Sequence, residues 1–138
     1  MIQCRFEDGG NAALRHVTVS SVIIDRKKER ILLAKRAPNL PNGGRWCLPG
    51  GYLGRDEVTK DAAMREVFEE TGYRTEVISL LRLIDTPSRP KEDKQNVEFA
   101  YILQALKKEK ELDTETTEIR WFNFKDVPPE HWASLPVE

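Results

Sequence analysis

Three glutamates in one short segment have a spacing that could hold a cation. Glu66, Glu69 and Glu70 lie three and four positions apart. On a helix, these spacings place all three carboxylates within about a third of the circumference. Like charges at such positions destabilise a helix, so the face is either an ordinary solvated surface or one that binds a cation. Carboxylate oxygens favour Mg²⁺, or Mn²⁺, over softer metals.

The residues around the glutamates favour a cation-binding site over an ordinary solvated surface. Gly50 and Gly51 follow an extended stretch and allow the backbone to approach a ligand closely. Glu57 and Arg65 could form an ion pair that braces the loop against the helix. The opposite helix face carries a conventional buried stripe of Ala63, Met64, Val67 and Phe68.

The complete spacing of segment 51–73 resembles the box of the Nudix family. Tyr73 is a mild departure, because the family usually has an aliphatic residue there. The strand pattern on both sides also resembles the Nudix fold, including the RWF strand at 120–122 and the DVP that follows. The fixed positions that match are Gly51, Glu57, Arg65, Glu66, Glu69, Glu70 and Gly72.

This resemblance implies a hydrolase that uses Mg²⁺, or Mn²⁺, and cleaves the diphosphate linkage of a nucleoside diphosphate joined to a moiety X. It implies that Glu66 and Glu70 are the primary metal ligands. Glu69 is expected to be a third ligand or to act through a water. The carbonyl of Gly51 is expected as a backbone ligand, and Glu57 could reach a further metal ion.

The general base is expected to be a glutamate, either in the box or on a loop outside it. Glu66 and Glu69 are the candidates within the box. Glu115 is the loop candidate, together with Glu118, although both also fit an ordinary charged turn. Glu98 lies on an expected strand and faces away from its apolar neighbours, toward either a cleft or solvent.

Two arginines are candidates for binding substrate phosphate. Arg36 ends the stretch ILLAKR, near the place where the family has a phosphate-binding arginine. A solvated strand end is the plain alternative. Arg89 lies on a basic loop that could fold over an anionic substrate, or that could have no binding role.

The resemblance favours ADP-ribose or a nucleotide sugar as the substrate. A nucleoside triphosphate pyrophosphatase of the MutT type is the alternative. A non-catalytic, ligand-sensing Nudix domain is a third reading. It is disfavoured because such domains usually have a degraded box and an attached DNA-binding module.

The elements that position these residues can be read from periodicity and turn signals. A helix is expected over 58–71, with Asp56 as its N-cap and Gly72 as its C′ residue. The order of elements predicts an α+β fold, an α/β/α sandwich with a mixed sheet, in a single domain covering 1–138. A short helical segment is expected at the C-terminus. Strands are expected at 15–24, 31–36, 74–85, 96–106 and 118–124, with a short extended piece at 46–49.

Composition limits the partners of the protein. The 138 residues carry a net charge of −1, which provides no basic field for nucleic acid or anionic lipid. No apolar run approaches the roughly 20 residues of a membrane span. Cys4 and Cys47 have no metal-type spacing, so we expect them to be reduced and the protein to be cytoplasmic. Either a short C-terminal helix or a partner subunit covers the second face of the sheet, so a homodimer is one of two alternatives.

Overall fold

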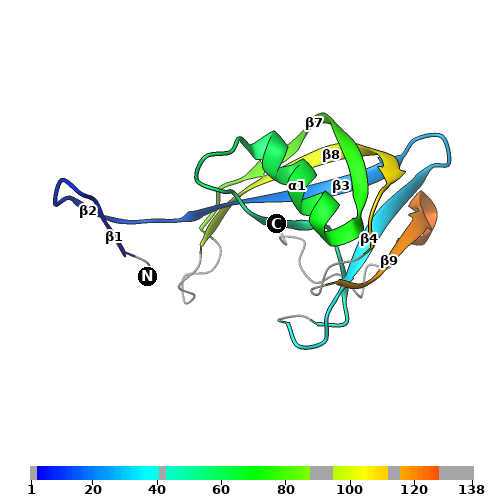
Figure 1. Cartoon of the computed structure of the whole chain (residues 1–138), viewed down its shortest axis with the longest axis horizontal. Helices are drawn as coiled ribbons and strands as arrows, with labels where there is room; N and C mark the ends of the chain where they lie inside the picture. The colour runs from blue at the N-terminus through cyan, green and yellow to red at the C-terminus, as the bar shows by residue number, and fades with distance from the viewer. Residues whose placement is uncertain (1–2, 41–42, 88–94, 112–115, 128–138) are drawn as a thin grey trace.

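A mixed β-sheet and one long helix position the glutamate segment (Figure 1). The computed structural model describes residues 3–40, 43–87, 95–111 and 116–127. The helix is α1 (Thr59–Thr71), and a 3₁₀ turn, η1, covers Phe124–Asp126. The strands are β1 (Gln3–Arg5), β2 (Asn11–Ala13), β3 (His16–Asp25), β4 (Arg30–Arg36), β5 (Trp46–Cys47), β6 (Gly50–Tyr52), β7 (Tyr73–Ile84), β8 (Asn96–Lys108) and β9 (Thr116–Asn123).

Strands β3 and β4 begin as a hairpin and then separate. They pair with each other only between Ile23–Asp25 and Arg30–Leu32. Beyond that point β3 pairs with β6, through Thr18 to Ser20, while β4 pairs with β5. The segment that leads into α1 therefore enters the sheet between two diverging strands. This placement brings Gly50 and Gly51 to the middle of the sheet.

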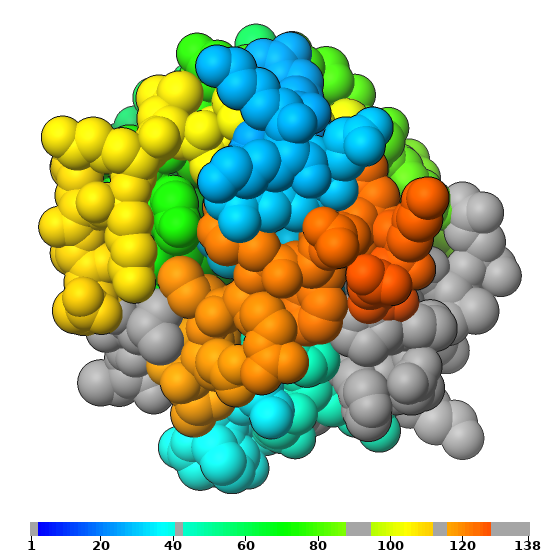
Figure 2. Space-filling view, turned by 90° about the vertical axis from the view of Figure 1, so that its right-hand side faces the viewer, coloured from blue at the N-terminus to red at the C-terminus, as the bar shows by residue number. Residues whose placement is uncertain are grey.

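The other strands extend the sheet in both directions. β8 runs parallel to β3 and β7 runs antiparallel to β8, so β7 is the edge of the sheet on that side. On the other side β9 runs antiparallel along the whole of β4. Figure 2 shows this end of the molecule, with β9 and η1 in orange beside the blue β3–β4 turn. Parallel and antiparallel pairs thus occur in one sheet, which confirms the predicted mixed sheet.

Apolar residues fill both faces of the sheet. The face toward α1 holds the main core, and Phe99, Tyr101 and Leu103 of β8 alternate onto it. The far face holds a smaller cluster. The buried residues of the main core are Val19, Ile23, Leu32, Ala62, Ala63, Val67, Tyr101 and Leu103, and those of the smaller cluster are Ile31, Leu33 and Trp46.

The C-terminal end of α1 agrees with the prediction and the N-terminal end does not. Gly72 adopts a left-handed conformation, with φ of 77°, and donates its N–H to the Phe68 carbonyl, as a helix-ending glycine should. The predicted N-cap at Asp56 is wrong. Val58 is the N-cap and makes no side-chain capping bond, while the Asp56 carboxylate instead pairs with exposed Arg55. The loop before α1 is instead fastened by Glu57, whose contacts are described below.

The expected long strands are confirmed to within two residues at nearly every end. Three short strands, β1, β2 and β6, were not predicted, although the Gly50–Tyr52 stretch was expected to lie close to the site. The expected C-terminal helical segment falls within 128–138, which lies outside the described residues. No helix among the described residues is long and apolar enough to cross a membrane.

Candidate metal and active site

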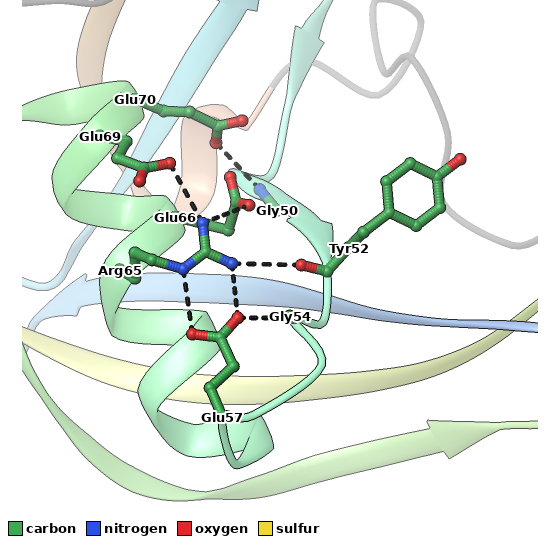
Figure 3. Close-up of polar contacts among 8 residues, drawn as sticks. All are labelled: Gly50, Tyr52, Gly54, Glu57, Arg65, Glu66, Glu69 and Glu70. Atoms are coloured by element: carbon green, nitrogen blue, oxygen red, sulfur yellow. Dashed lines mark hydrogen bonds and ion pairs between the residues drawn. The ribbon is translucent and has the colours of Figure 1, made fainter.

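Arg65 lies at the centre of a polar network that joins α1 to the loop before it (Figure 3). Its guanidinium donates two hydrogen bonds to Glu57, with Nε to Oε2 at 3.1 Å and Nη2 to Oε1 at 2.6 Å. Nη1 reaches Glu66 at 2.9 Å and Glu69 at 3.2 Å. Nη2 also donates to the backbone carbonyl of Tyr52, at 3.2 Å, on strand β6. The predicted ion pair between Glu57 and Arg65 is confirmed, and it is one part of a larger arrangement.

Glu57 closes the loop from its other side. Its Oε1 accepts the N–H of Gly54 at 2.7 Å, so one carboxylate ties both the loop and the helix. The hydrogen bond from Arg65, followed by the one from Gly54, holds the pKa of Glu57 below the ordinary value of 4.5. The hydrogen bonds to Glu57, the largest cause, and to Glu66 raise the pKa of Arg65. Both groups are therefore charged at neutral pH.

Gly51 brings the backbone of β6 against the Glu66 carboxylate. A Cβ added at Gly51 would lie 2.5 Å from the carboxylate carbon of Glu66 and 2.5 Å from its Oε1. The neighbouring Gly50 donates its N–H to Glu70 Oε2 at 2.9 Å. Two glutamates of α1 therefore meet two consecutive glycines of β6, and a side chain at position 51 would fit only if β6 or Glu66 moved.

The donors at this junction are the hard oxygens that Mg²⁺ or Mn²⁺ prefers. The Glu66 side chain is 15% exposed and that of Glu69 is 48% exposed, so this face of α1 is sheltered at Glu66 and open to solvent at Glu69. Among the described residues, no three His, Cys, Asp or Glu side chains converge closely enough to form a ready cation site. Glu66 and Glu69 turn toward Arg65, and Glu70 turns toward Gly50. The donor types fit a divalent cation, and binding one would require rotation of these side chains.

Arg36 lies at the same end of the sheet as Glu70. Both act on the thiol of Cys47, Glu70 through its charge and Arg36 through its charge and a hydrogen bond. Burial is the largest cause that raises the pKa of Cys47, to about 11, followed by Glu70. The thiol donates to the Ala34 carbonyl at 3.3 Å. Cys47 therefore stays protonated at neutral pH, as expected of a structural residue, and Arg36 and Glu70 both lie near its thiol.

The structure describes two of the remaining candidate residues outside the box and not the other two. Arg89 and Glu115 lie outside the described residues. Glu118 lies on β9, where its Oε2 accepts from Arg120 Nη2 at 2.6 Å. Glu98 is half-buried and sits in register with Thr18 on the sheet face away from α1. That position separates Glu98 from Glu66 and Glu69, which lie on the opposite side of the sheet.

Three backbone contributions were not foreseen: the N–H of Gly50, the carbonyl of Tyr52 and the N–H of Gly54. Residue type does not reveal which backbone groups form hydrogen bonds, so in the sequence only the glycines indicate these contacts. The pair at 50–51 was interpreted as permitting close approach. Gly54 has a similar role, because a Cβ there would lie 3.0 Å from Glu57 Oε1.

Known proteins share both the sequence and the fold. The NUDIX domain model matches residues 14–137. An ADP-ribose pyrophosphatase of Methanocaldococcus jannaschii is 32% identical over 113 residues, covering 82% of this chain and 66% of that protein. A MutT-like protein of Streptomyces ambofaciens is 37% identical over 83 residues, covering 60% of this chain and 51% of that protein. The chain thus spans from about half to just under two thirds of the length of these relatives.

Solved structures agree with this assignment. A NUDIX hydrolase from Nitrosomonas europaea superposes with a TM-score of 0.78 at 24% identity, covering 91% of this chain and 68% of that one. A MutT NUDIX hydrolase from Burkholderia pseudomallei superposes with a TM-score of 0.70 at 27% identity, covering 83% of this chain and 88% of that one. With its mixed sheet, its single described helix and a family match over most of its length, the chain belongs to the Nudix hydrolase family.

Proposed function

We propose that the chain hydrolyses the diphosphate linkage of a nucleoside diphosphate joined to a second moiety, with ADP-ribose or a nucleotide sugar as the substrate. The observation that carries this proposal is the junction of β6 and α1. There Glu66 and Glu70 meet Gly51 and Gly50, and Arg65 holds the loop in place. The ADP-ribose pyrophosphatase of Methanocaldococcus jannaschii, at 32% identity, supports the choice of substrate.

Glu66, Glu70 and the Gly51 carbonyl would hold the divalent cation, Mg²⁺ or Mn²⁺, with Glu69 as a third carboxylate. Glu57 could reach a further ion. Members of this family generally use divalent metals. When bound, such an ion neutralises the charge of the diphosphate oxygens. The role of Arg65 and Glu57 is to keep β6 and α1 at a fixed separation, because a small misplacement of these ligands would cost much of the rate.

Hydrolysis requires a positioned water and a group that takes its proton. Water attacks one phosphorus, the bridging P–O bond breaks, and the products are a nucleoside monophosphate and a phosphorylated second moiety. We propose Glu69 as the group that accepts the proton, since it is the most exposed carboxylate of the Arg65 network. Glu66 and Glu115 are the other candidates. Arg36 and Arg89 are proposed to bind the phosphates, and the placement of Arg36 near the Cys47 thiol, where Glu70 also lies, supports its role.

A second candidate function is pyrophosphohydrolysis of a nucleoside triphosphate. The MutT-like relative of Streptomyces ambofaciens, at 37% identity, favours it. Both reactions cut a phosphoanhydride and would use the same carboxylates, so the difference lies in the substrate. We also propose that the protein is cytoplasmic, in keeping with its two free cysteines, and that it forms a homodimer.

A substrate panel with Mg²⁺ tests the proposed reaction. ADP-ribose, sugar nucleotides, and normal and oxidised nucleoside triphosphates are incubated with the protein, and the released monophosphate or pyrophosphate is measured. We expect the greatest kcat/KM with ADP-ribose or a sugar nucleotide. The Glu70→Gln variant should lose at least about 100-fold in kcat, because a cation ligand is replaced by a neutral amide.

The matched control is Glu111→Gln, which makes the same chemical change at a carboxylate that is 93% exposed. This variant should keep wild-type turnover. Wild-type activity in the Glu70→Gln protein would contradict the proposed ligand. Preference for a triphosphate would favour the second candidate, and tight binding without turnover across the panel would point to a sensing domain.

A further inference from the structure

The edge strand β7 exposes aliphatic side chains along its middle. Within the described residues β7 pairs only with β8, so its outer row of backbone N–H and C=O groups has no partner strand (Figure 1). Ile78, Leu80, Leu81 and Leu83 are 39%, 49%, 52% and 49% exposed. Four exposed aliphatic residues within six positions is unusual for a free edge, because such an edge invites pairing with another strand.

Two bulges contribute to this exposure. The pairing of β7 with β8 passes from Val77–Leu103 to Ser79–Ile102, which leaves Ile78 without a partner, and from Leu80–Tyr101 to Arg82–Ala100, which leaves out Leu81. A bulge usually protects an edge by bending it or by placing a charge there. Here each bulged position carries a large aliphatic side chain, and both are exposed. The strand is therefore shaped for a partner that covers it.

The charges that flank this run are arranged as a self-complementary pair. Glu76 precedes the uncharged run 77–81 and Arg82 follows it. Glu76 is in register with Gln104 of β8, and Arg82 with Ala100. Positions 100 and 104 share one face of β8, since side chains alternate along a strand, so the acid and the base lie on the same sheet face. Two copies of this strand, set antiparallel, can place each acid opposite the other copy's base.

We propose that β7 is the dimer interface, and that it pairs antiparallel with β7 of a second copy about a two-fold axis at Ser79. Pairing about Ser79 places Glu76 opposite Arg82 of the partner chain, twice per dimer. It also places Ile78 opposite Leu80, and Val77 opposite Leu81. The two sheets then continue as one, and the unpaired backbone groups of both edges are satisfied.

The register about Ser79 is favoured over its neighbours. Moving the axis one residue to Leu80 would place Glu76 opposite Ile84 and Arg82 opposite Ile78, so both charges would lose their partners. Arg82 already interacts within its own chain, but its five N–H donors can also serve a second carboxylate. This inference gives the proposed homodimer a surface and a register. It does not depend on catalysis, so its failure would leave the proposed hydrolysis untouched.

Sedimentation or light scattering on the full chain tests the interface. At about 50 μM, wild type should have twice the 15.9 kDa mass of one chain. Leu81→Lys should raise the dimer dissociation constant at least about tenfold, because it places a charge within the apolar run. Glu76→Arg should raise it about tenfold, since two attractive pairs become repulsive. The double variant Glu76→Arg/Arg82→Glu should return to within about threefold of wild type, because it rebuilds both pairs with the charges exchanged.

Phe124→Lys is the matched control. Phe124 is 50% exposed, as Leu81 is to within a few per cent, but it lies on η1 beside β9 at the other side of the sheet. This variant should remain dimeric. Circular dichroism on every variant separates dissociation from unfolding. A monomeric wild type at this concentration would overturn the proposal. So would a dimer that tolerates Leu81→Lys, or a double variant as weak as Glu76→Arg alone.

Discussion

Arg65 shows how much of this site depends on one side chain. It donates to three carboxylates and to one backbone carbonyl, and these acceptors come from α1, from strand β6 and from the loop between them. A lysine offers a point charge and cannot match several planar acceptors at once. The network explains why Glu66 and Glu69 do not simply repel each other on one helix face, while Glu70 turns toward Gly50. A cation supplied by the chain already lies among them.

Glu57 yields a pH-dependent prediction. Its pKa is lower in the folded chain than its ordinary value of 4.5, first because Arg65 donates to it and then because Gly54 does. The stabilisation is therefore fully present above that ordinary value and is lost as the pH falls through the lower, folded pKa. Wild type should be more stable than Glu57→Gln at about pH 7, and the difference should shrink toward about pH 3.

Urea unfolding of both proteins across this range measures that difference. Glu111→Gln serves as the control, because this carboxylate is 93% exposed and its contact with Lys108 is long, at 3.8 Å. Its curve should run parallel to that of wild type at every pH. A gap between wild type and Glu57→Gln that stayed constant into acid would show that the Glu57 carboxylate gains nothing from Arg65.

At the element scale, periodicity predicts the long elements well and the short ones poorly. β3 and β8 are rich in β-branched and apolar residues, and α1 buries Ala62, Ala63 and Val67 on one face, so the positions of these elements follow from the sequence. β6 reads Gly-Gly-Tyr and has no strand propensity of its own. It is a strand because β3, diverging from β4, offers a free edge to it. The predicted N-cap failed for a similar reason: the loop is held by Arg65 and Gly54 through Glu57, not by a cap at Asp56.

The same division holds for the candidate site. The i, i+3 and i+4 spacing of Glu66, Glu69 and Glu70 is a property of one helix, so the sequence predicts their common face. The contact of Glu70 with Gly50 joins residues 20 positions apart and depends on how α1 packs against β6. No spacing rule reaches that far. Only the resemblance makes Arg36 a phosphate-binding candidate, and no spacing rule predicts that Arg36 and Glu70 both lie near Cys47.

The close approach of β6 to α1 predicts the outcome of Gly51→Ala. The added Cβ would lie 2.5 Å from the Glu66 carboxylate, so either β6 or Glu66 must move. We expect at least about a tenfold loss of kcat with about 1–2 kcal/mol of destabilisation. Gly10→Ala is the control, because its Cβ would meet only the exposed side chains of Asp8, at 3.1 Å, and Phe6, at 3.8 Å, outside the site. Full activity in the Gly51→Ala protein would mean that the separation between β6 and α1 is not critical.

At the scale of the whole molecule, the sheet separates two kinds of surface. One side carries α1 with its glutamates at the centre, and the far edge carries the aliphatic run of β7. A dimer through β7 would leave β6 open, because β8 and β3 lie between β7 and β6 in the sheet. Hydrolysis and dimerisation are therefore separable by mutation. The Leu81→Lys variant should have a lower mass in solution than the wild-type dimer, with an unchanged kcat.

Cation binding should stabilise the whole fold. An ion that binds only the folded chain at ten times its dissociation constant adds about 1.4 kcal/mol. For a domain of this size, that corresponds to a rise of about 3–6 °C in the melting temperature. Mg²⁺ should produce this rise in wild type, and Mn²⁺ should do the same. Glu70→Gln should show a smaller rise at equal Mg²⁺, since one of the proposed ligands is lost.

Calorimetry with and without chelator measures this effect in the absence of any substrate. KCl at matched ionic strength is the control for general screening, which would weaken the surface ion pairs in every variant alike. Glu111→Gln should respond to Mg²⁺ as wild type does, because Glu111 is 93% exposed and lies outside the glutamate cluster. If the melting temperature of wild type did not change with either cation, the carboxylates of α1 would be partners of Arg65 alone, and the proposed metal-dependent hydrolysis would lose its physical basis.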